Sequence, residues 1–309
     1  MFGESLTCCY LYVITKYGYP PPAERTLTYL EEMKALGFRS VELEGIREAH
    51  LLAVYEQREE IRVRMHALNL TVPYFCAVLP GLSSSDSGER TRNLELFEKG
   101  CEVAALLGAR GILDNAPLPP YRFPDDIPVV RHYDEDVLQV ASFPSALSWG
   151  AYWSDLVATL REACDRASAF GLTYQLHPAL GVLAATTDGF LYLYDAVGRD
   201  NLRFTLDTAN QFMMRENLAL AVLRLAPYLD YIHVSDNRGH RVEHLPLGRG
   251  AIPWDDFFDA LERVGFSGHL GVDVGGAETA VPDLDEAYRE TAEWLSRRVA
   301  SIYTDRNPE

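Results

Sequence analysis

Short apolar runs alternate with longer amphipathic segments along most of the chain. The segments at 24–38 and 91–109 are clear cases, since their apolar residues recur every three or four positions, as on a helix with one buried face. The apolar runs have the length of buried strands. They are SLTCCYLYV (5–13), RSVELEG (39–45), LTVPYFCAVL (70–79), ARGILDNA (109–116), LTYQLHPAL (172–180), LRFTLDTAN (202–210), YIHVSDN (231–237) and HLGVDVGG (269–276).

Glycines mark the predicted ends of the helices. Gly37, Gly108, Gly171 and Gly265 each stand just before the next apolar run, where a left-handed residue commonly ends a helix. Alternation of strands with helices is typical of parallel sheets joined by crossovers. Eight such units predict an α/β protein with a single (β/α)8 TIM-barrel domain over residues 1–309. An open doubly wound sheet is the alternative.

One connection is much longer than the others. It spans residues 117–150, follows the fourth predicted strand, and contains several prolines and aromatic residues. In a barrel it emerges at the carboxyl end of the strands, where active sites are built. Long loops in compact domains are usually functional or disordered. We therefore expect a lid or a subunit contact, with a passive excursion as the alternative, and no linker that divides the chain.

The balance of charge narrows the classes of partner. The chain carries 45 acidic and 28 basic residues, for a net charge of −17. Nucleic-acid backbones are bound mainly through Lys and Arg, so we expect no nucleic-acid partner. No apolar stretch approaches the ~18 residues of a transmembrane helix, so we expect no membrane partner.

The N-terminal segment and the cysteines favour a cytoplasmic protein. The first 22 residues lack the basic start and uniform apolar block of a signal peptide. The five cysteines are odd in number and scattered through apolar segments, which predicts buried free thiols in a reducing compartment. They are Cys8, Cys9, Cys76, Cys101 and Cys164.

Polar residues close the last four predicted strands. His177, Asp207, His233 and Asp273 each lie in phase with the side of the strand that faces the barrel interior, because residues two apart share a face. We expect these four side chains to converge at the barrel mouth. Two imidazoles and two carboxylates there suit a divalent metal such as Mn, Zn, Fe or Co. A hydrogen-bonded network without metal is the alternative.

Several stretches resemble the xylose isomerase-like barrel superfamily, specifically its sugar phosphate isomerase/epimerase and endonuclease IV-like group. The resemblance covers nearly the whole chain. The strongest stretch is HLPLGRGAIPWDDFFDALERVGFSGHLGVDV (244–274), which looks like the family's G-x-G and I-x-W followed by a helix and a final strand. The other stretches are GFRSVELEG, GLTYQLHP, FTLDTAN and YIHVSD.

The resemblance implies a metal centre with two changed ligands. In the family's ketose epimerases, a Glu, an Asp, a His and a second Glu hold the metal at the ends of strands five to eight. Asp207 and His233 keep their types, whereas the two Glu positions fall on His177 and Asp273. Manganese is the ion we expect first, with Zn, Fe, Co or Mg as alternatives. In those epimerases the two glutamates also transfer the proton of the substrate carbon. Because both are replaced in this chain, the resemblance predicts the metal site more specifically than the type of reaction.

The function that the resemblance implies is a metal-dependent isomerase or epimerase of a ketose or keto-sugar, acting through an enediolate. His177, Asp273 and Glu44 are the candidate bases; Glu44 shares its phase with Glu42 on the second predicted strand. A keto-sugar lyase or dehydratase is a close alternative, because the same intermediate can expel a β-substituent. An endonuclease IV-like phosphodiesterase and a non-catalytic sugar-binding barrel are further alternatives. The expected partner is a small sugar-like substrate, and a homo-oligomer is possible.

Other polar residues are weaker candidates for contacts with the substrate. Arg249 lies between two glycines and suits either an oxyanion or a plain turn. Asp236 follows His233 by three residues and is expected to orient it, while Trp254 matches a family position that packs the start of a helix. The remaining substrate candidates are Asn210, Gln175 and, on the long connection, Arg131, His132 and Tyr133.

Overall fold

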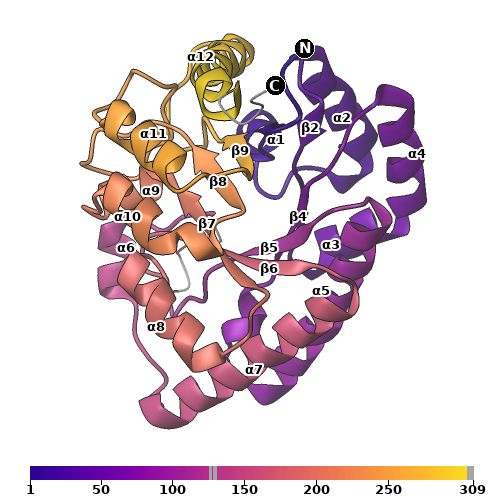
Figure 1. The fold of residues 1–309 in the computed structure, drawn as a ribbon. Helices are drawn as coiled ribbons and strands as arrows, with labels where there is room; N and C mark the ends of the chain where they lie inside the picture. The colour runs from indigo at the N-terminus through magenta and orange to yellow at the C-terminus, as the bar shows by residue number, and fades with distance from the viewer. Residues whose placement is uncertain (125–126, 128–130, 305–309) are drawn as a thin grey trace.

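The computed structural model describes residues 1–124, 127 and 131–304, and its strands form the inner layer of the molecule (Figure 1). The strands are β1 (Leu6–Cys8), β2 (Ser40–Val41), β3 (Leu43–Ile46), β4 (Tyr74–Val78), β5 (Gly111–Asn115), β6 (Thr173–His177), β7 (Leu202–Asp207), β8 (Tyr231–Val234) and β9 (His269–Val272). All their pairings are parallel, in the order β2-β1-β9-β8-β7-β6-β5-β4-β3.

The ring of strands closes through a single stretch of chain. β2 pairs with β1, and β3 pairs with β4, so the two short strands are halves of one strand interrupted at Glu42. Glu42 itself still donates its backbone N–H to the carbonyl oxygen of Cys8 at 2.8 Å. The predicted parallel barrel is therefore confirmed, with its near-closure at the point where Glu42 lies.

Helices surround this inner layer (Figure 1). Leu176, Leu206 and Ile232, which have the opposite phase to the polar strand ends, are fully buried between strands and helices, as alternation predicts. The helices are α1 (Leu11–Tyr17), α2 (Thr26–Ala35), α3 (Arg47–Glu56), α4 (Arg58–Leu68), α5 (Ser87–Leu106), α6 (Glu135–Val140), α7 (Trp149–Ala169), α8 (Thr187–Val197), α9 (Thr208–Met213), α10 (Leu218–Leu225), α11 (Trp254–Arg263) and α12 (Leu284–Thr304), with short 3-10 turns at Ala23–Arg25, Pro80–Ser83 and Ala226–Tyr228.

Local chemistry sets several helix ends. Asp86, Thr186 and Asn217 accept backbone N–H bonds at the starts of α5, α8 and α10. The four glycines predicted to end helices all have positive φ, between 66° and 104°. The five cysteines are buried free thiols, as predicted. Within the described residues, no helix combines the length and apolar character needed to cross a membrane.

The first predicted strand is too long. The apolar run 5–13 was expected to be extended throughout, but only Leu6–Cys8 is strand, and helix α1 begins at Leu11. The N–H groups of Val13 and Ile14 turn back to the carbonyl oxygen of Tyr10. Both parts of the run are buried, so hydrophobicity alone does not distinguish a core strand from a core helix.

The lower barrel interior is filled by aromatic and amide side chains. The rings of Tyr74 and Tyr231 stack with centroids 4.3 Å apart. A Cβ on Gly271 would lie 2.6 Å from the Tyr231 hydroxyl oxygen and 2.4 Å from the Cys9 sulfur, so only glycine leaves room for that hydroxyl. The hydroxyl in turn donates to Glu42. This packed floor closes the barrel interior below the strand-end residues.

The long connection 117–150 has structure of its own. It contains α6 and an antiparallel bridge between Arg122 and Ser142. The rings of Phe123 and Tyr133 stack at 4.3 Å, and Tyr121 contacts Phe123 and Phe143. Residues 125–126 and 128–130 of the predicted lid lie outside the described residues.

Asp236 organises the loop between β8 and α11. Its buried carboxylate accepts four hydrogen bonds, from the backbone N–H groups of Asn237, Gly248 and Ile252 and from the Trp254 indole, at 2.9–3.2 Å. A Cβ on Gly250 would lie 2.2 Å from this carboxylate. The G-x-G stretch and Trp254 are therefore both held by the Asp236 carboxylate. Trp254 begins α11, the helix start at which it was expected to pack. Asp236 does not orient His233, contrary to the expectation from its spacing.

We predict that Asp236→Ala lowers the free energy of unfolding by about 3 kcal/mol or more, because it leaves buried donors without an acceptor. Urea denaturation of the two proteins measures the difference. Asp200→Ala, at an exposed carboxylate, is the matched control and should stay within about 0.5 kcal/mol of the parent. Equal midpoints for Asp236→Ala and the parent would refute the anchoring role.

Candidate metal centre

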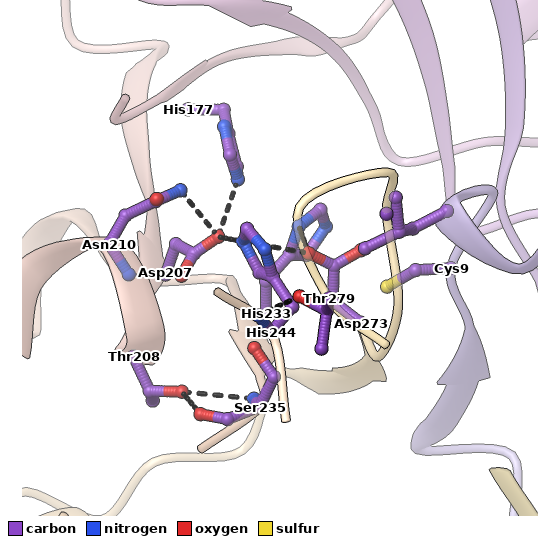
Figure 2. Close-up of polar contacts among 12 residues, drawn as sticks. Cys9, His177, Asp207, Thr208, Asn210, His233, Ser235, His244, Asp273 and Thr279 are labelled. Carbon is purple, nitrogen blue, oxygen red and sulfur yellow. Dashed lines mark hydrogen bonds and ion pairs between the residues drawn. The ribbon is translucent and has the colours of Figure 1, made fainter. Parts of the chain in front are cut away.

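The four polar strand ends converge as predicted (Figure 2). His177 ends β6, Asp207 ends β7, His233 lies in β8, and Asp273 directly follows β9. One ligand atom from each side chain lies within 4.8 Å of the corresponding atom of every other. All four residues are at most 3% exposed. The parallel register produces this convergence, because Asp207 pairs with His233 across neighbouring strands.

Asp207 is the most heavily bonded member of the cluster. Its Oδ2 lies 3.0 Å from His177 Nε2 and accepts from the side-chain amide of Asn210 at 2.9 Å, while its Oδ1 accepts from the Asn210 backbone N–H at 2.8 Å. Burial raises the pKa of Asp207, but the hydrogen bonds from His177 and His244 hold it well below its usual value. Asp207 is therefore a fixed carboxylate. Asn210, a predicted ligand contact, lies at the cluster.

Glu42 holds His233 in place. Its Oε2 lies 3.1 Å from His233 Nε2 and accepts from the Tyr231 hydroxyl at 3.1 Å, while Oε1 accepts from the Tyr10 N–H at 3.2 Å. Burial raises the pKa of Glu42, but the charge of His233 brings it below its usual value. Burial lowers the pKa of His233, yet Glu42 and Asp273 raise it to about 9. With Nε2 engaged, Nδ1 is the nitrogen of His233 that faces Asp273, at 3.8 Å.

Unpartnered polar atoms within this cluster fit a divalent cation. Among the described residues, neither carboxylate oxygen of Asp273 has a hydrogen bond, and the same holds for the Nδ1 atoms of His177 and His233. Buried polar atoms without partners are costly, and a cation would satisfy the carboxylate and the ring nitrogens together. His177, Asp207, His233 and Asp273 would hold it. Two nitrogen and two oxygen donors suit Mn, Fe, Co or Zn.

His244 and Glu278 are site residues that the sequence reading missed. His244 Nε2 lies 3.5 Å from Asp207 Oδ2, and its Nδ1 lies 3.0 Å from Glu278. Burial lowers the pKa of His244, but the hydrogen bonds to Asp207 and Glu278 raise it to about 10. Burial raises the pKa of Glu278, but His244 brings it to about 2. The only available signal was that His244 opens the stretch carrying the strongest family resemblance.

Two of the remaining predicted residues, Glu44 and His132, lie close to the cluster. Glu44 is buried and lines a small cavity together with His177 and His233; burial and the charge of Glu42 raise its pKa to about 8. The His132 ring stacks on His244, with centroids 5.6 Å apart.

Two predicted substrate contacts are not brought to the cluster. The side-chain amide of Gln175 donates to Thr173 and to Asp230, which precedes β8, at the amino end of the strands. Arg249 is exposed in the turn that Asp236 anchors.

A larger cavity of about 350 Å³ opens beside the metal cluster. Its walls come mainly from the loops after β1, β3, β4, β5 and β6, including the long connection. It shares Tyr19, Val78, Asn115 and Arg131 with the small cavity that His177, His233 and Glu44 line. The volume suits a small organic ligand. The larger cavity therefore adjoins the cluster.

The model of one protein family, described as "Xylose isomerase-like TIM barrel", matches residues 30–298. The chain belongs to this family. A ketose 3-epimerase of Arthrobacter globiformis is 29% identical over 132 residues, 41% of this chain and 43% of that protein. An L-ribulose 3-epimerase of Mesorhizobium japonicum is 28% identical over 147 residues, 46% of each protein. The chain spans less than half the length of these relatives.

Several solved structures share the fold of this chain at low sequence identity. D-allulose 3-epimerase from Methylomonas sp. in complex with D-allulose has a TM-score of 0.71 and 17% identity, covering 96% of this chain and 98% of that one. The 3-keto-D-glucoside 4-epimerase from E. coli has a TM-score of 0.71 and 18% identity, covering 96% and 100%. At such identities the similarity establishes the barrel fold.

We predict that the purified protein binds about one equivalent of a divalent metal and that Asp207→Ala/His233→Ala loses it, because two of the four ligands are gone. Elemental analysis after adding Mn, Zn, Fe or Co to each protein measures the content. His66→Ala, at an exposed helix position, is the control. Circular dichroism checks that the double variant is folded. If the parent protein retains none of the four ions, the four strand-end residues form a hydrogen-bonded network without metal.

Glu42→Gln should weaken metal binding roughly tenfold to hundredfold while leaving the four ligands intact, because partners that orient a ligating histidine have effects of this size. Competition with a chelator of known affinity gives the dissociation constant. Glu290→Gln, at an exposed position on α12, should match the parent. An unchanged constant in a folded Glu42→Gln protein would show that His233 needs no such support.

Proposed function

We propose that the protein is a divalent-metal-dependent epimerase or isomerase of a ketose or keto-sugar, acting through an enediolate. The observation that carries this proposal is the convergence of His177, Asp207, His233 and Asp273, with unpartnered ligand atoms, at the carboxyl end of the barrel. Family membership and the partial similarity to ketose 3-epimerases support it.

The bound metal would polarise the substrate carbonyl and stabilise the negative charge of the enediolate. The protein's own task is then to remove a proton from the carbon beside that carbonyl and to return one. His177 and Glu44 suit this task by position. They come from β6 and β3, with β4 and β5 between them, yet line the same small cavity.

Two proton carriers on opposite walls permit inversion at one carbon. For proton transfer His177 would leave the metal to Asp207, His233 and Asp273, because a neutral imidazole bound to a metal carries a proton on its other nitrogen. Nε2 would then stay hydrogen-bonded to Asp207, and Nδ1, which has no hydrogen-bond partner among the described residues, is free to accept a proton. In our proposal Nδ1 takes the proton from one face of the substrate carbon, and the Glu44 carboxyl gives its proton to the other face. Return of the proton to the neighbouring carbon instead gives isomerisation.

Asp273 has the position of the family's second glutamate but is one methylene shorter. We propose it chiefly as a metal ligand, and as the second base if Glu44 proves dispensable. Its neighbour Arg131, 3.5 Å away, lies in the long connection.

A keto-sugar lyase or dehydratase is the second candidate. The replacement of both family glutamates by His177 and Asp273 favours it, because elimination needs one base and one acid for the leaving group rather than a symmetric pair. The product distinguishes the two reactions: elimination releases the β-substituent and leaves an unsaturated ketone, whereas epimerisation conserves every atom.

We predict that the metal-loaded protein exchanges a carbon-bound hydrogen of a ketose with solvent. D-fructose, D-allulose, L-ribulose and a 3-keto-D-glucoside are incubated in D₂O, and NMR follows both deuterium uptake and product. Glu44→Gln should reduce turnover roughly 10²- to 10⁴-fold, the usual contribution of a general acid or base, at unchanged metal content. Glu290→Gln is the matched control. Full turnover by Glu44→Gln would remove Glu44 from the mechanism.

A further inference from the structure

Arg47 adopts a backbone conformation that is unusual for its type. It directly follows β3 and begins α3 at the carboxyl face of the barrel, with φ 57°. A bulky residue in the left-handed region typically costs about 1–3 kcal/mol and is found where the surroundings require it, often at ligand sites. The Arg47 side chain lines the 350 Å³ cavity.

Arg131 enters the same cavity from the long connection. Its side chain is 15% exposed and lies 3.5 Å from Asp273 and 3.9 Å from Glu278. Its NH1 atom and the Nε atom of Arg47 are buried, and neither has a hydrogen-bond partner among the described residues. Both arginines lie near enough to Tyr19 to affect its ionisation. Burial raises the pKa of the Tyr19 hydroxyl, and the positive charges of Arg47 and Arg131 oppose that rise.

The carboxylates near Arg131 have other partners. Glu278 is bonded to His244, and Asp273 belongs to the metal cluster. When a divalent cation takes up the charge of Asp273, the Arg131 guanidinium loses part of its neutralisation. Since unpaired buried charge is costly, the cavity then favours an incoming anion.

Two other acids in the cavity wall do not cancel this preference. Glu89 is exposed and accepts the Ser84 hydroxyl at 2.5 Å. Asp114 accepts the Leu79 N–H, and burial raises its pKa to about 8, so at neutral pH it is largely uncharged. The buried part of the wall is therefore positive, in a chain whose net charge is −17.

We infer that Arg47 and Arg131 bind an anionic group of the substrate, a carboxylate or a phosphate, while its carbonyl end lies at the metal cluster. This inference rests on the proposed function and narrows it to acidic ketoses. Guanidinium groups suit both anions, because their planar N–H donors match two oxygens at once. The lining residues that the two cavities share place the larger one directly beside the cluster.

Calorimetric titration of the metal-loaded protein tests the inference with four probes: D-fructose, D-fructose 6-phosphate, D-fructuronate and inorganic phosphate. We expect at least one of the two anionic sugars to bind tenfold or more tightly than D-fructose. Tighter binding of the phosphate ester, with inorganic phosphate as a competitor, assigns a phosphate; tighter binding of D-fructuronate assigns a carboxylate. D-fructose binding as tightly as both anionic sugars would overturn the inference.

Variants separate the role of the arginines from stability. Arg47→Gly should keep or raise the melting temperature, because glycine adopts φ 57° without strain, yet lose the preference for the anionic sugar roughly tenfold or more. Arg131→Gln should lose the same preference. Arg199→Gln, at an exposed arginine paired with Asp165, is the charge-matched control. A preference unaffected by Arg47→Gly and Arg131→Gln would refute the site.

The deuterium-exchange assay keeps the two proposals apart. Arginine-dependent binding of an anionic sugar, with no exchange on any ketose, supports the anion site and contradicts the epimerase. Exchange on neutral ketoses, with no preference for anionic ones, supports the epimerase and overturns the inference.

Discussion

The desolvation of ionisable side chains at one end of a parallel barrel is the constraint on which the site depends. Parallel strands bring their carboxyl ends to the same side, so His177, Asp207, His233 and Asp273 are buried together rather than dispersed. Removing such groups from water is costly unless each finds a partner. The contacts around these side chains supply such partners for most of them. The carboxylate of Asp273 accepts no hydrogen bond within the described residues, so it is the group that still lacks one.

Histidine–carboxylate pairs supply most of the partners. Glu42 fixes His233, Asp207 fixes His177, and Glu278 fixes His244, each at 3.0–3.1 Å. These pairs leave Nδ1 of His177 and of His233 without a hydrogen bond in the described structure, whereas Nε2 of His244 faces Asp207 Oδ2 at 3.5 Å. A ring held by one nitrogen presents the other in a defined direction, which is how proteins orient metal ligands. The Tyr231 hydroxyl joins this layer to the packed barrel floor, where Gly271 leaves space for it.

The long connection 117–150 forms one wall of the cavity beside the metal cluster. Its aromatic residues pack on one another, and its Arg131 and His132 reach the metal cluster from outside the barrel strands. With Arg47 on the facing loop, it makes the cavity beside the cluster locally positive although the chain is strongly acidic. Membership in the xylose isomerase-like family accounts for the barrel, whereas the proposed substrate preference depends on loops, which differ from one barrel to another.

The pattern of residues along the chain is enough to predict the parallel barrel, the helix-ending glycines and the four strand-end residues, because a period of two and a parallel arrangement together specify which side chains face the interior. It misplaced the helix at Leu11, since a run buried on all sides has no informative period. It assigned the support of His233 to Asp236, its neighbour in the chain, whereas Glu42 provides it across 191 positions. His244 and Glu278 are site residues that only the tertiary structure identifies, and it also places the expected Arg131 at 3.5 Å from Asp273, because loop conformation and contacts across the barrel carry no periodic signal in the chain.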